Sequence, residues 1–492
     1  MLVQLLLSAV ALGSPFGSGC VLQRGRPVPV WGFADSGARV EVLFGGHAAS
    51  ASAGADGRWR VDLPAMDASA EGRVLSVSDG KSSASAADVL VGEVWLASGQ
   101  SNMAFSFLSS NPRNRERGAG LVAQLTRCPR LRIAKVSVRA AQEPATHANV
   151  SWFAATPENL TGRRGSASAV AFFFAKTLLE NLDVPVGVVD ASVGATAIDS
   201  WIPAPEYVGM SPPEPGAKRY PPQVYFNGMV APLAPFAFRG LVWYQGESNA
   251  KKGEIEKYPD KLRALRGGLA RVLGNEGLSI RLAQIAPCSN PLVPEMQCAM
   301  ARYAEGEPLA SACVTADVGN LFDIHPNDKE TVGRRLAALA LKYDYGFDLR
   351  ADSPRVVRGA VFGDGRVCLA VSDARSLYVY DPDWPYRSDP ARSASIGFEL
   401  AGADGEWKPA RIANLVRTVT RRDSQTGNEA SEFRGELEGA EIVLEAEGVT
   451  APVRARHAFR KPWRSYVYNE ASLPLGAFEI CLEPREGEGA PL

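Results

Sequence analysis

Short segments in which apolar and polar residues alternate dominate the first part of the chain. They occupy residues 28–33, 38–44, 57–63 and 73–78, and turn-forming pairs such as Asp56-Gly57 and Asp79-Gly80 stand between them. Alternation with a period of two places every second side chain on one face, which is typical of a strand with one buried face. The pattern therefore predicts an N-terminal β-sandwich domain over residues 1–88.

The pattern changes between residues 89 and 348, where continuous apolar runs alternate with segments of helical spacing. Apolar runs at 92–97, 184–189, 239–244, 280–285 and 313–318 predict buried strands, and apolar residues spaced by three or four predict helices at 169–182, 258–273 and 329–343. Pro326-Asn327-Asp328 suits the start of the last helix. Strands that alternate with helices predict a parallel sheet covered on both faces, and hence an α/β domain over residues 89–348.

Strand-type alternation returns after residue 349, for example at 366–371, 441–445 and 453–459. A C-terminal β domain is therefore expected over residues 349–492. The chain of 492 residues is longer than one hydrophobic core usually supports, which agrees with three domains.

Charge and cysteine content exclude several classes of partner and cofactor. The net charge is −1 and the charges are dispersed, so neither nucleic acid nor a membrane surface is expected as a partner. The seven cysteines are scattered and lack close ligand spacing, which argues against a zinc site and a disulfide framework. The pattern indicates no metal or other cofactor, and it contains no information on the oligomeric state.

The apolar run at residues 2–12 has two interpretations, a signal peptide or a first strand. It is short and has no Lys or Arg before it. The scattered thiols and the missing basic residue favour the cytoplasm slightly over a secreted or periplasmic location. No later apolar segment reaches the ~18 residues that a membrane helix needs.

The strongest chemical signal is a serine directly after a buried strand. The apolar run from Gly92 ends in Ser98-Gly99-Gln100-Ser101-Asn102, so a tight turn would present the Ser101 hydroxyl at the carboxyl edge of the sheet. Ligands of parallel α/β sheets bind at that edge. The Gly-x-Ser-x-Gly pattern of α/β-hydrolases is absent, although the logic of an exposed nucleophile on a sharp turn is the same.

A serine nucleophile needs a base, a group that orients the base, and donors for the oxyanion. Of four histidines, only His325 follows a central strand and precedes a helix, with Asp323 two residues before it. Two further loops follow apolar strands: residues 190–196 contain Gly194, and residues 243–249 offer the amide of Gln245. We expect all of these groups to meet at one edge of the sheet.

These motifs resemble the sequence blocks of SGNH hydrolases, in the branch of sialate O-acetylesterases and related acetylxylan esterases. The similar blocks are residues 99–103, the Gly194 loop, residues 243–249 and Asp323-Ile324-His325-Pro326, with further similarity at residues 21–32 and 458–478. The resemblance implies a flavodoxin-like α/β fold with Ser101 as nucleophile and His325 as general base. It also implies an oxyanion hole formed by the backbone N–H groups of Ser101 and Gly194 and by Gln245.

The chain departs from the SGNH pattern at two places. Position 195 is Ala where a second glycine is frequent. The triad acid usually stands three residues before the histidine, where this chain has Phe322. Asp323 is the expected orienting group, and Asp317 or a backbone carbonyl is an alternative; with a carbonyl, the site would be a Ser–His dyad.

The expected function is removal of acetyl groups from O-acetylated sialic acid by a serine hydrolase mechanism without a cofactor. An esterase for acetylated xylan or another polysaccharide is the alternative substrate class. Two less favoured hypotheses are a non-catalytic carbohydrate-binding protein and a glycosidase that uses Glu247 and Asp323. A sugar ring could stack on aromatic residues near the site, which have an equally good interpretation as core residues: Trp201, Tyr225, Trp243 and Tyr244.

Overall fold

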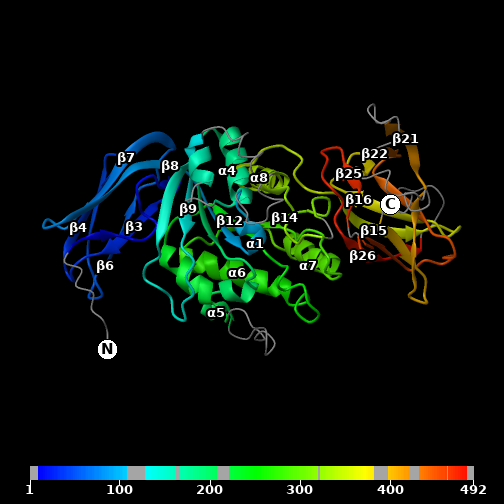
Figure 1. The fold of residues 1–492 in the computed structure, drawn as a ribbon, viewed down its shortest axis with the longest axis horizontal. Helices are drawn as coiled ribbons and strands as arrows, with labels where there is room; N and C mark the ends of the chain where they lie inside the picture. Colours follow the sequence, from blue (N-terminus) through cyan, green and yellow to red (C-terminus); the bar gives the residue numbers. More distant parts are fainter. Residues whose placement is uncertain are drawn as a thin grey trace.

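The computed structural model describes residues 9–107, 128–161, 167–207, 221–319, 322–381, 397–421, 432–461 and 464–484. It is a mixed α/β structure with several sheets. Along its longest axis, strands near the N-terminus lie at one end, a sheet with helices lies in the middle, and strands near the C-terminus lie at the other end (Figure 1).

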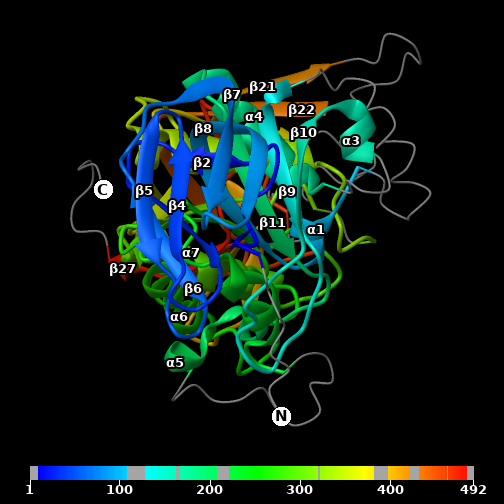
Figure 2. The ribbon, with the colours of Figure 1, turned by 90° about the vertical axis from the view of Figure 1, so that its left-hand side faces the viewer.

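The N-terminal strands cover one end of the molecule (Figure 2). β1 pairs with β3 and β3 with β6, while β4 pairs with β5 and β7. In β4 and β6 exposed and buried residues alternate strictly, as the sequence pattern predicts. The described end of the apolar N-terminal run forms β1, and residues 1–8 lie outside the described part. These strands are β1 (Ala11–Leu12), β2 (Val21–Gln23), β3 (Val28–Phe33), β4 (Arg39–Phe44), β5 (His47–Ser52), β6 (Arg58–Leu63) and β7 (Ser69–Ser78).

A single long strand, β8 (Ser83–Gly99), connects these strands to the central sheet. Its first half pairs antiparallel with β7, and its last residues pair parallel with β11 and β12. Every residue from Val89 to Gly99 is buried, whereas most residues before Val89 are exposed or half-buried. The expected boundary between residues 88 and 89 therefore lies inside a continuous strand, at the point where its burial changes.

The central strands follow the order β10-β9-β11-β8-β12-β13-β14, and all neighbours except β10 and β9 are parallel. Helices α4 and α8 pack on the side of the sheet that Trp95 faces, and α6 and α7 on the side of Leu96. These strands are β9 (Cys128–Val136), β10 (Val150–Ala155), β11 (Val186–Ser192), β12 (Gly240–Tyr244), β13 (Ser279–Ala283) and β14 (Ala310–Cys313).

Three expected helices are present as α4 (Ala169–Leu182), α6 (Tyr258–Leu273) and α8 (Lys329–Tyr345). The Asp328 side chain accepts a hydrogen bond from Thr331 N at 2.9 Å, so the expected start of α8 is confirmed. A further helix, α7 (Val293–Gly306), was not expected. The shorter helices are α1 (Ser101–Ala104), α3 (Pro157–Thr161), η1 (Ile198–Trp201), α5 (Ala204–Tyr207), η2 (Phe226–Val230) and η3 (Ala231–Leu233).

The strand expected at residues 313–318 is wrong by several residues, because β14 ends at Cys313. Beyond it, the Thr315 hydroxyl donates to the carbonyl of Gln284 at 2.9 Å, and Val318 N bonds the carbonyl of Thr315. These bonds turn the chain out of the sheet. The apolar composition of this segment reflects burial in a turn, not pairing in a strand.

The C-terminal strands form three further sheets around a separate apolar core that includes Leu369, Val379, Leu400 and Leu444. They are β15 (Arg355–Val361), β16 (Val367–Ser372), β17 (Leu377–Asp381), β18 (Phe398–Ala401), β19 (Trp407–Pro409), β20 (Arg411–Ile412), β21 (Leu415–Arg421), β22 (Glu432–Leu437), β23 (Glu441–Glu445), β24 (Arg454–His457), β25 (Val467–Asn469), β26 (Phe478–Cys481) and β27 (Glu483–Pro484).

None of the helices in the described residues combines the length and the apolar character required to cross a membrane. All seven cysteines lie in described residues, and no disulfide joins any of them.

Candidate active site

Ser101 stands where β8 ends and α1 begins. Gln100 N donates to the carbonyl of Tyr244 at 3.0 Å, which ties the turn to the neighbouring strand β12. Gly99 has φ +138°, and a Cβ there would lie 2.2 Å from the carbonyl oxygen of Tyr244. Only glycine fits this close approach. The tight turn leaves Ser101 partly exposed beyond the sheet edge.

His325 reaches the serine from the loop before α8. Its Nε2 lies 2.9 Å from Ser101 Oγ, which is a hydrogen-bonding distance. The two residues are far apart in the sequence and meet because β8 and the loop before α8 end at the same edge of the sheet. This contact between a hydroxyl and an imidazole is the arrangement needed to activate a serine nucleophile.

The two candidate orienting carboxylates have different partners. Asp323 Oδ1 accepts a hydrogen bond from the backbone N of His325 at 2.8 Å, and lies 3.5 Å from His325 Nδ1. The latter distance exceeds that of an ordinary N–H···O bond. Asp317 uses both carboxylate oxygens in a bidentate ion pair with Arg335, at 2.7 Å each. Asp323 is therefore the carboxylate that contacts His325, through a longer contact than a typical triad acid makes.

The surroundings of His325 favour the neutral imidazole that a general base needs. Burial lowers the pKa of His325 below its usual value, and the nearby Lys329 adds to this, while Asp323 acts in the opposite direction. A lowered pKa means that the imidazole is unprotonated at neutral pH. Its Nε2 can then accept the Ser101 proton.

The Gly194 loop lies directly beside the serine. A Cβ built on Gly194 would be 3.5 Å from the Cβ of Ser101. In the described part of the chain, neither the backbone N–H of Ser101 nor that of Gly194 has a hydrogen-bond partner. The next residue, Ala195, has φ +62°, a left-handed conformation that glycine adopts more readily. Two unpaired N–H groups beside a nucleophile are what an oxyanion requires.

Gln245 is completely buried, and internal contacts engage its amide. Its Nε2 lies 3.0 Å from Gln100 Oε1, 3.1 Å from the carbonyl of Thr196 and 2.8 Å from Asn249 Oδ1. An amide nitrogen has only two hydrogens, so these acceptors use both. The expected contribution of Gln245 to the oxyanion hole stays a prediction, and its contacts tie together three of the loops at the site.

Comparison with known proteins identifies the family. The family model described as carbohydrate esterase, sialic acid-specific acetylesterase, matches residues 91–342, slightly more than half of the chain. This chain belongs to that family. Human sialate O-acetylesterase is 29% identical over 299 residues, which cover 53% of this chain and 54% of that protein. Rat sialate O-acetylesterase is 27% identical over 396 residues, 64% of this chain and 70% of that protein. The chain thus spans about half the length of the human relative it matches.

A solved structure of similar extent comes from Xanthomonas citri and is described as a novel carbohydrate acetylesterase. It is 29% identical, covers 96% of this chain and 99% of its own, and has a TM-score of 0.81. The similarity therefore includes the strands at both ends of the molecule as well as the central sheet of the esterase family. The matched family segment contains Ser101, Gly194, Gln245 and His325.

The roles of two side chains within the motifs, and of one just beyond them, were missed by the sequence analysis. Gln100 is buried, and its Oε1 accepts from Gln245 Nε2 and from Ser248 N at 3.2 Å. Asn102 and Lys329 are buried behind Ser101 and hydrogen-bond each other. The sequence does contain a signal for Lys329, because a lysine in the first turn of a helix opposes the helix dipole.

The aromatic residues considered as sugar platforms are core residues. Each is at most 3% exposed: Trp201, Tyr225, Trp243 and Tyr244. Trp201 stacks on Tyr225 with ring centroids 5.4 Å apart. Near His325, Phe322 is 97% exposed and Ile324 41% exposed, so these two residues present apolar surface beside the candidate site.

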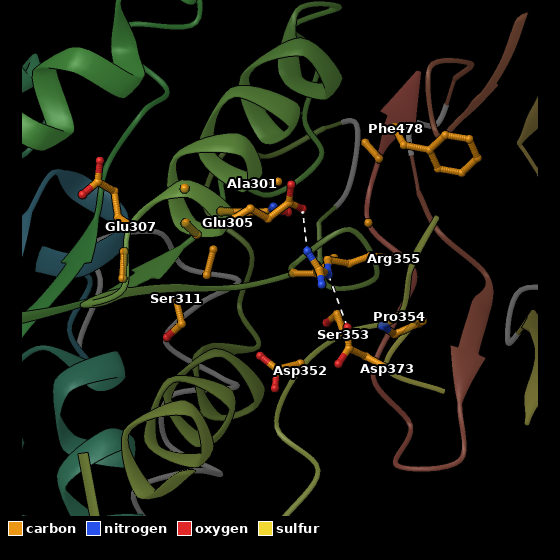
Figure 3. A pocket seen from close by; sticks show the side chains of 18 of the residues that line it. Ala301, Glu305, Glu307, Ser311, Asp352, Ser353, Pro354, Arg355, Asp373 and Phe478 are labelled. Carbon is orange, nitrogen blue, oxygen red and sulfur yellow. Dashed lines mark hydrogen bonds and ion pairs between the residues drawn. The ribbon is translucent and has the colours of Figure 1, made fainter. Parts of the chain in front are cut away.

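A separate cavity of about 430 Å³ lies where α7 and β14 meet the first C-terminal strands (Figure 3). Arg355 extends between Glu305 and Asp373 and forms ion pairs with both, at 3.1 and 3.3 Å. None of the residues that line this cavity belongs to the group around Ser101 and His325. Its carboxylates already have cationic partners, and it contains no activated nucleophile.

Proposed function

We propose that this protein is a carbohydrate O-acetylesterase that removes acetyl groups from O-acetylated sialic acid by a serine hydrolase mechanism. The observation that carries the proposal is the 2.9 Å contact between His325 Nε2 and Ser101 Oγ, beside the Gly194 N–H, which has no partner among the described residues. Membership of the sialic acid-specific acetylesterase family supports the substrate class.

In the proposed reaction, His325 Nε2 takes the hydroxyl proton while Ser101 Oγ attacks the acetyl carbonyl carbon. The carbonyl oxygen becomes an oxyanion, and the N–H groups of Ser101 and Gly194 donate to it. As the intermediate collapses, the imidazolium returns the proton to the sugar oxygen, and the C–O bond to the sugar breaks. Water activated by the same histidine then releases acetate and restores the serine.

We further propose that Asp323 stabilises the imidazolium formed during the reaction. Its contact with Nδ1 is 3.5 Å, so we assign it an electrostatic role with limited geometric control. Asp317 is already paired with Arg335, which supports Asp323 as the carboxylate that acts on His325.

We propose the same division of the chain that the sequence suggests: a flavodoxin-like α/β hydrolase domain at residues 89–348 between β domains at 1–88 and 349–492. The hydrolase domain is supported by the parallel pairing of β9, β11, β8, β12, β13 and β14. The C-terminal β domain is supported by its separate apolar core. The continuity of β8 implies that the N-terminal β domain is rigidly joined to the hydrolase domain.

The glycosidase alternative has no support in the geometry. Glu247 Oε1 is bound by the side chain of Asn102, and Asp323 by a backbone N–H, so neither carboxylate is placed as a free acid or nucleophile. Polysaccharide deacetylation remains the second substrate class, and the test below separates it from sialate.

The test is acetate release from 9-O-acetylated sialic acid, acetylated xylan and 4-nitrophenyl acetate by wild type and Ser101→Ala. We expect kcat to fall by roughly 10⁴- to 10⁶-fold in the variant, as when the nucleophile of a comparable hydrolase is removed. Ser52→Ala, which changes an exposed serine on β5, is the matched control and should keep full activity. If acetylated xylan were the better substrate, acetylated polysaccharide would replace sialate as the proposed substrate class. Equal activity in wild type and Ser101→Ala would show that Ser101 is not the nucleophile.

A further inference from the structure

Asn102, the residue after the proposed nucleophile, is completely buried and contacts three different segments. Its Nδ2 donates to Glu247 Oε1 at 2.5 Å and to the carbonyl of Ile324 at 3.1 Å. Its Oδ1 accepts from Lys329 Nζ at 2.5 Å. One amide therefore connects the nucleophile turn with the loop after β12, the histidine loop and the start of α8.

The two charged neighbours determine which way this amide points. Glu247 needs a donor, and Lys329 needs an acceptor. A flipped amide would place Oδ1 against the Glu247 carboxylate and the Ile324 carbonyl, and its NH₂ group against the Lys329 ammonium. All three contacts would then be repulsive, so the amide has one orientation.

Lys329 and Glu247 have few other ways to compensate their charges. Lys329 is 1% exposed, and its Nζ lies 4.7 Å from the ring centroid of Phe105 and 5.6 Å from that of Tyr244. Glu247 Oε2 is buried, with no hydrogen-bond partner in the described part of the chain. Burial raises the pKa of Glu247 and lowers that of Lys329, so both groups depend on hydrogen bonds to Asn102 in this packing.

The amide acts on the catalytic pair from both sides. Asn102 is bonded covalently to Ser101, and the Ile324 carbonyl that it binds belongs to the residue before His325. One side chain therefore links the backbone beside Ser101 to the backbone beside His325. Misplacement of a reacting group by about 1 Å can cost a hundredfold in rate.

We propose that Glu247, Asn102 and Lys329 form a buried positioning unit that holds His325 against Ser101, with Asn102 as its central residue. The inference rests on the proposed function and extends it to residues that the serine hydrolase mechanism does not use. None of the three touches the reacting atoms, so they are positioning residues and not catalytic ones.

The unit also affects the charge state of the histidine. The groups that act on His325 are Lys329, which lowers its pKa, and Asp323, which raises it. Those that act on Lys329 are Glu247, Asp323 and Asp328, which oppose the effect of burial, and the net pKa of Lys329 is lowered to about 7. Below that pH the lysine is charged and disfavours the imidazolium. Removing the lysine charge should therefore raise the pKa of His325 and move the acid limb of kcat/KM to higher pH.

The first variant is Asn102→Leu, which keeps the side-chain shape and removes all three hydrogen bonds. We measure kcat and KM for 4-nitrophenyl acetate, together with the rate at which a serine-directed phosphonate labels the protein. We expect kcat and the labelling rate to fall at least about 100-fold, while KM changes less than about threefold, because the loss lies in alignment. Unchanged kcat would overturn the proposal.

The second set keeps the test decisive even where Asn102→Leu does not fold. Glu247→Gln preserves an acceptor and removes the charge, so we expect a smaller fall in kcat, about 10-fold. Lys329→Met should raise the apparent pKa of the acid limb by roughly half to one unit. Lys342→Met changes a lysine on the same helix that pairs with Asp352, and should leave the limb in place. An acid limb that is the same in Lys329→Met and wild type contradicts the proposal.

Failure of the inference is distinguishable from failure of the proposed function. If wild type releases acetate and Ser101→Ala does not, the function stands whatever Asn102 does. If wild type hydrolyses none of the three esters and Ser101 is not labelled, the function itself fails. Full activity in Asn102→Leu together with an inactive Ser101→Ala would overturn only the positioning unit.

Discussion

Gln100 and Ser101 are consecutive residues in one turn, yet their surroundings differ sharply. Gln100 is 3% exposed, and its Oε1 accepts hydrogen bonds from Gln245 Nε2 and Ser248 N. Ser101 is partly exposed, its hydroxyl has His325 as partner, and its backbone N–H has none in the described part of the chain. The protein engages the side-chain oxygen of Gln100, whereas the backbone N–H of Ser101 keeps hydrogen-bonding capacity for a substrate.

The difference teaches how a precise site is built on a turn. Buried polar groups are almost always paired, so the contacts of Gln100 hold the backbone at the sheet edge without any ligand. Unpaired N–H groups persist only where solvent or a substrate can reach them. The hydrogen bonds of Gln100 thus hold the Ser101 hydroxyl and N–H in position before a substrate binds. Electrostatic catalysis requires this preorganisation.

The same contrast separates Gln245 from Gly194, the two loop residues expected to bind the oxyanion. Gln245 lies on the satisfied side, with its amide hydrogens engaged, and Gly194 lies on the open side next to Ser101. If the contrast is correct, changes on the two sides have different consequences. Changes on the satisfied side reduce stability, and changes on the open side reduce the rate.

The largest effect on stability is expected from Gln245→Leu. This variant removes the hydrogen bonds that Gln245 Nε2 donates to Gln100, Asn249 and the carbonyl of Thr196, and the bond that its Oε1 accepts from Tyr258. Gln100 and Asn249 keep backbone donors, but the Thr196 carbonyl loses this donor, so the free energy of unfolding should fall by about 2–4 kcal/mol. Urea unfolding measures this loss.

Gln297→Leu is the matched control, because this buried glutamine on α7 donates one hydrogen bond, to the carbonyl of Ile285 at 2.8 Å. Its loss should be about 1 kcal/mol. Were Gln245→Leu to keep wild-type stability and lose 10²- to 10³-fold in kcat, Gln245 would be an oxyanion donor after all.

A smaller effect is expected from Asp323→Asn. Asp323 raises the pKa of His325, so its removal lowers that pKa and moves the acid limb of kcat/KM to lower pH. A less basic imidazole is a weaker base, and the plateau should fall by about 10- to 100-fold. The pH profile of ester hydrolysis gives both values.

Asp317→Asn is the control for this change, since it weakens the ion pair with Arg335 and does not alter the charge beside His325. It should reduce stability and leave the acid limb unchanged. A shift of the limb in Asp317→Asn, with none in Asp323→Asn, would exchange the roles of the two carboxylates.

The smallest effect is expected from Ala195→Gly. The left-handed φ of +62° costs an alanine about 1–2 kcal/mol, and the greater freedom of glycine in the unfolded chain offsets part of the gain. A net increase of about 0.5 kcal/mol in the free energy of unfolding is expected, with little change in kcat. A clear loss of kcat would show that Ala195 restrains the Gly194 N–H.

The sequence by itself determined the class of each region and the main candidates for chemistry. Period-two alternation marks β4 and β6 because each has one buried face, and continuous apolar runs mark β11 and β12 because both of their faces are covered. Ser101 and His325 stand out because strand ends in parallel sheets share an edge. These are local or topological properties, so a linear pattern contains them.

Tertiary structure alone decided which polar groups are used internally and which are left open. The sequence offers Gln245 as an oxyanion donor and Asp317 as an alternative orienting acid. In the structure, Gln245 Nε2 donates to Thr196 and Asn249, and Asp317 pairs with Arg335. The roles of Asn102 and Lys329 depend likewise on contacts across more than 200 residues. Such contacts follow from packing in three dimensions, and periodicity along the chain does not record them.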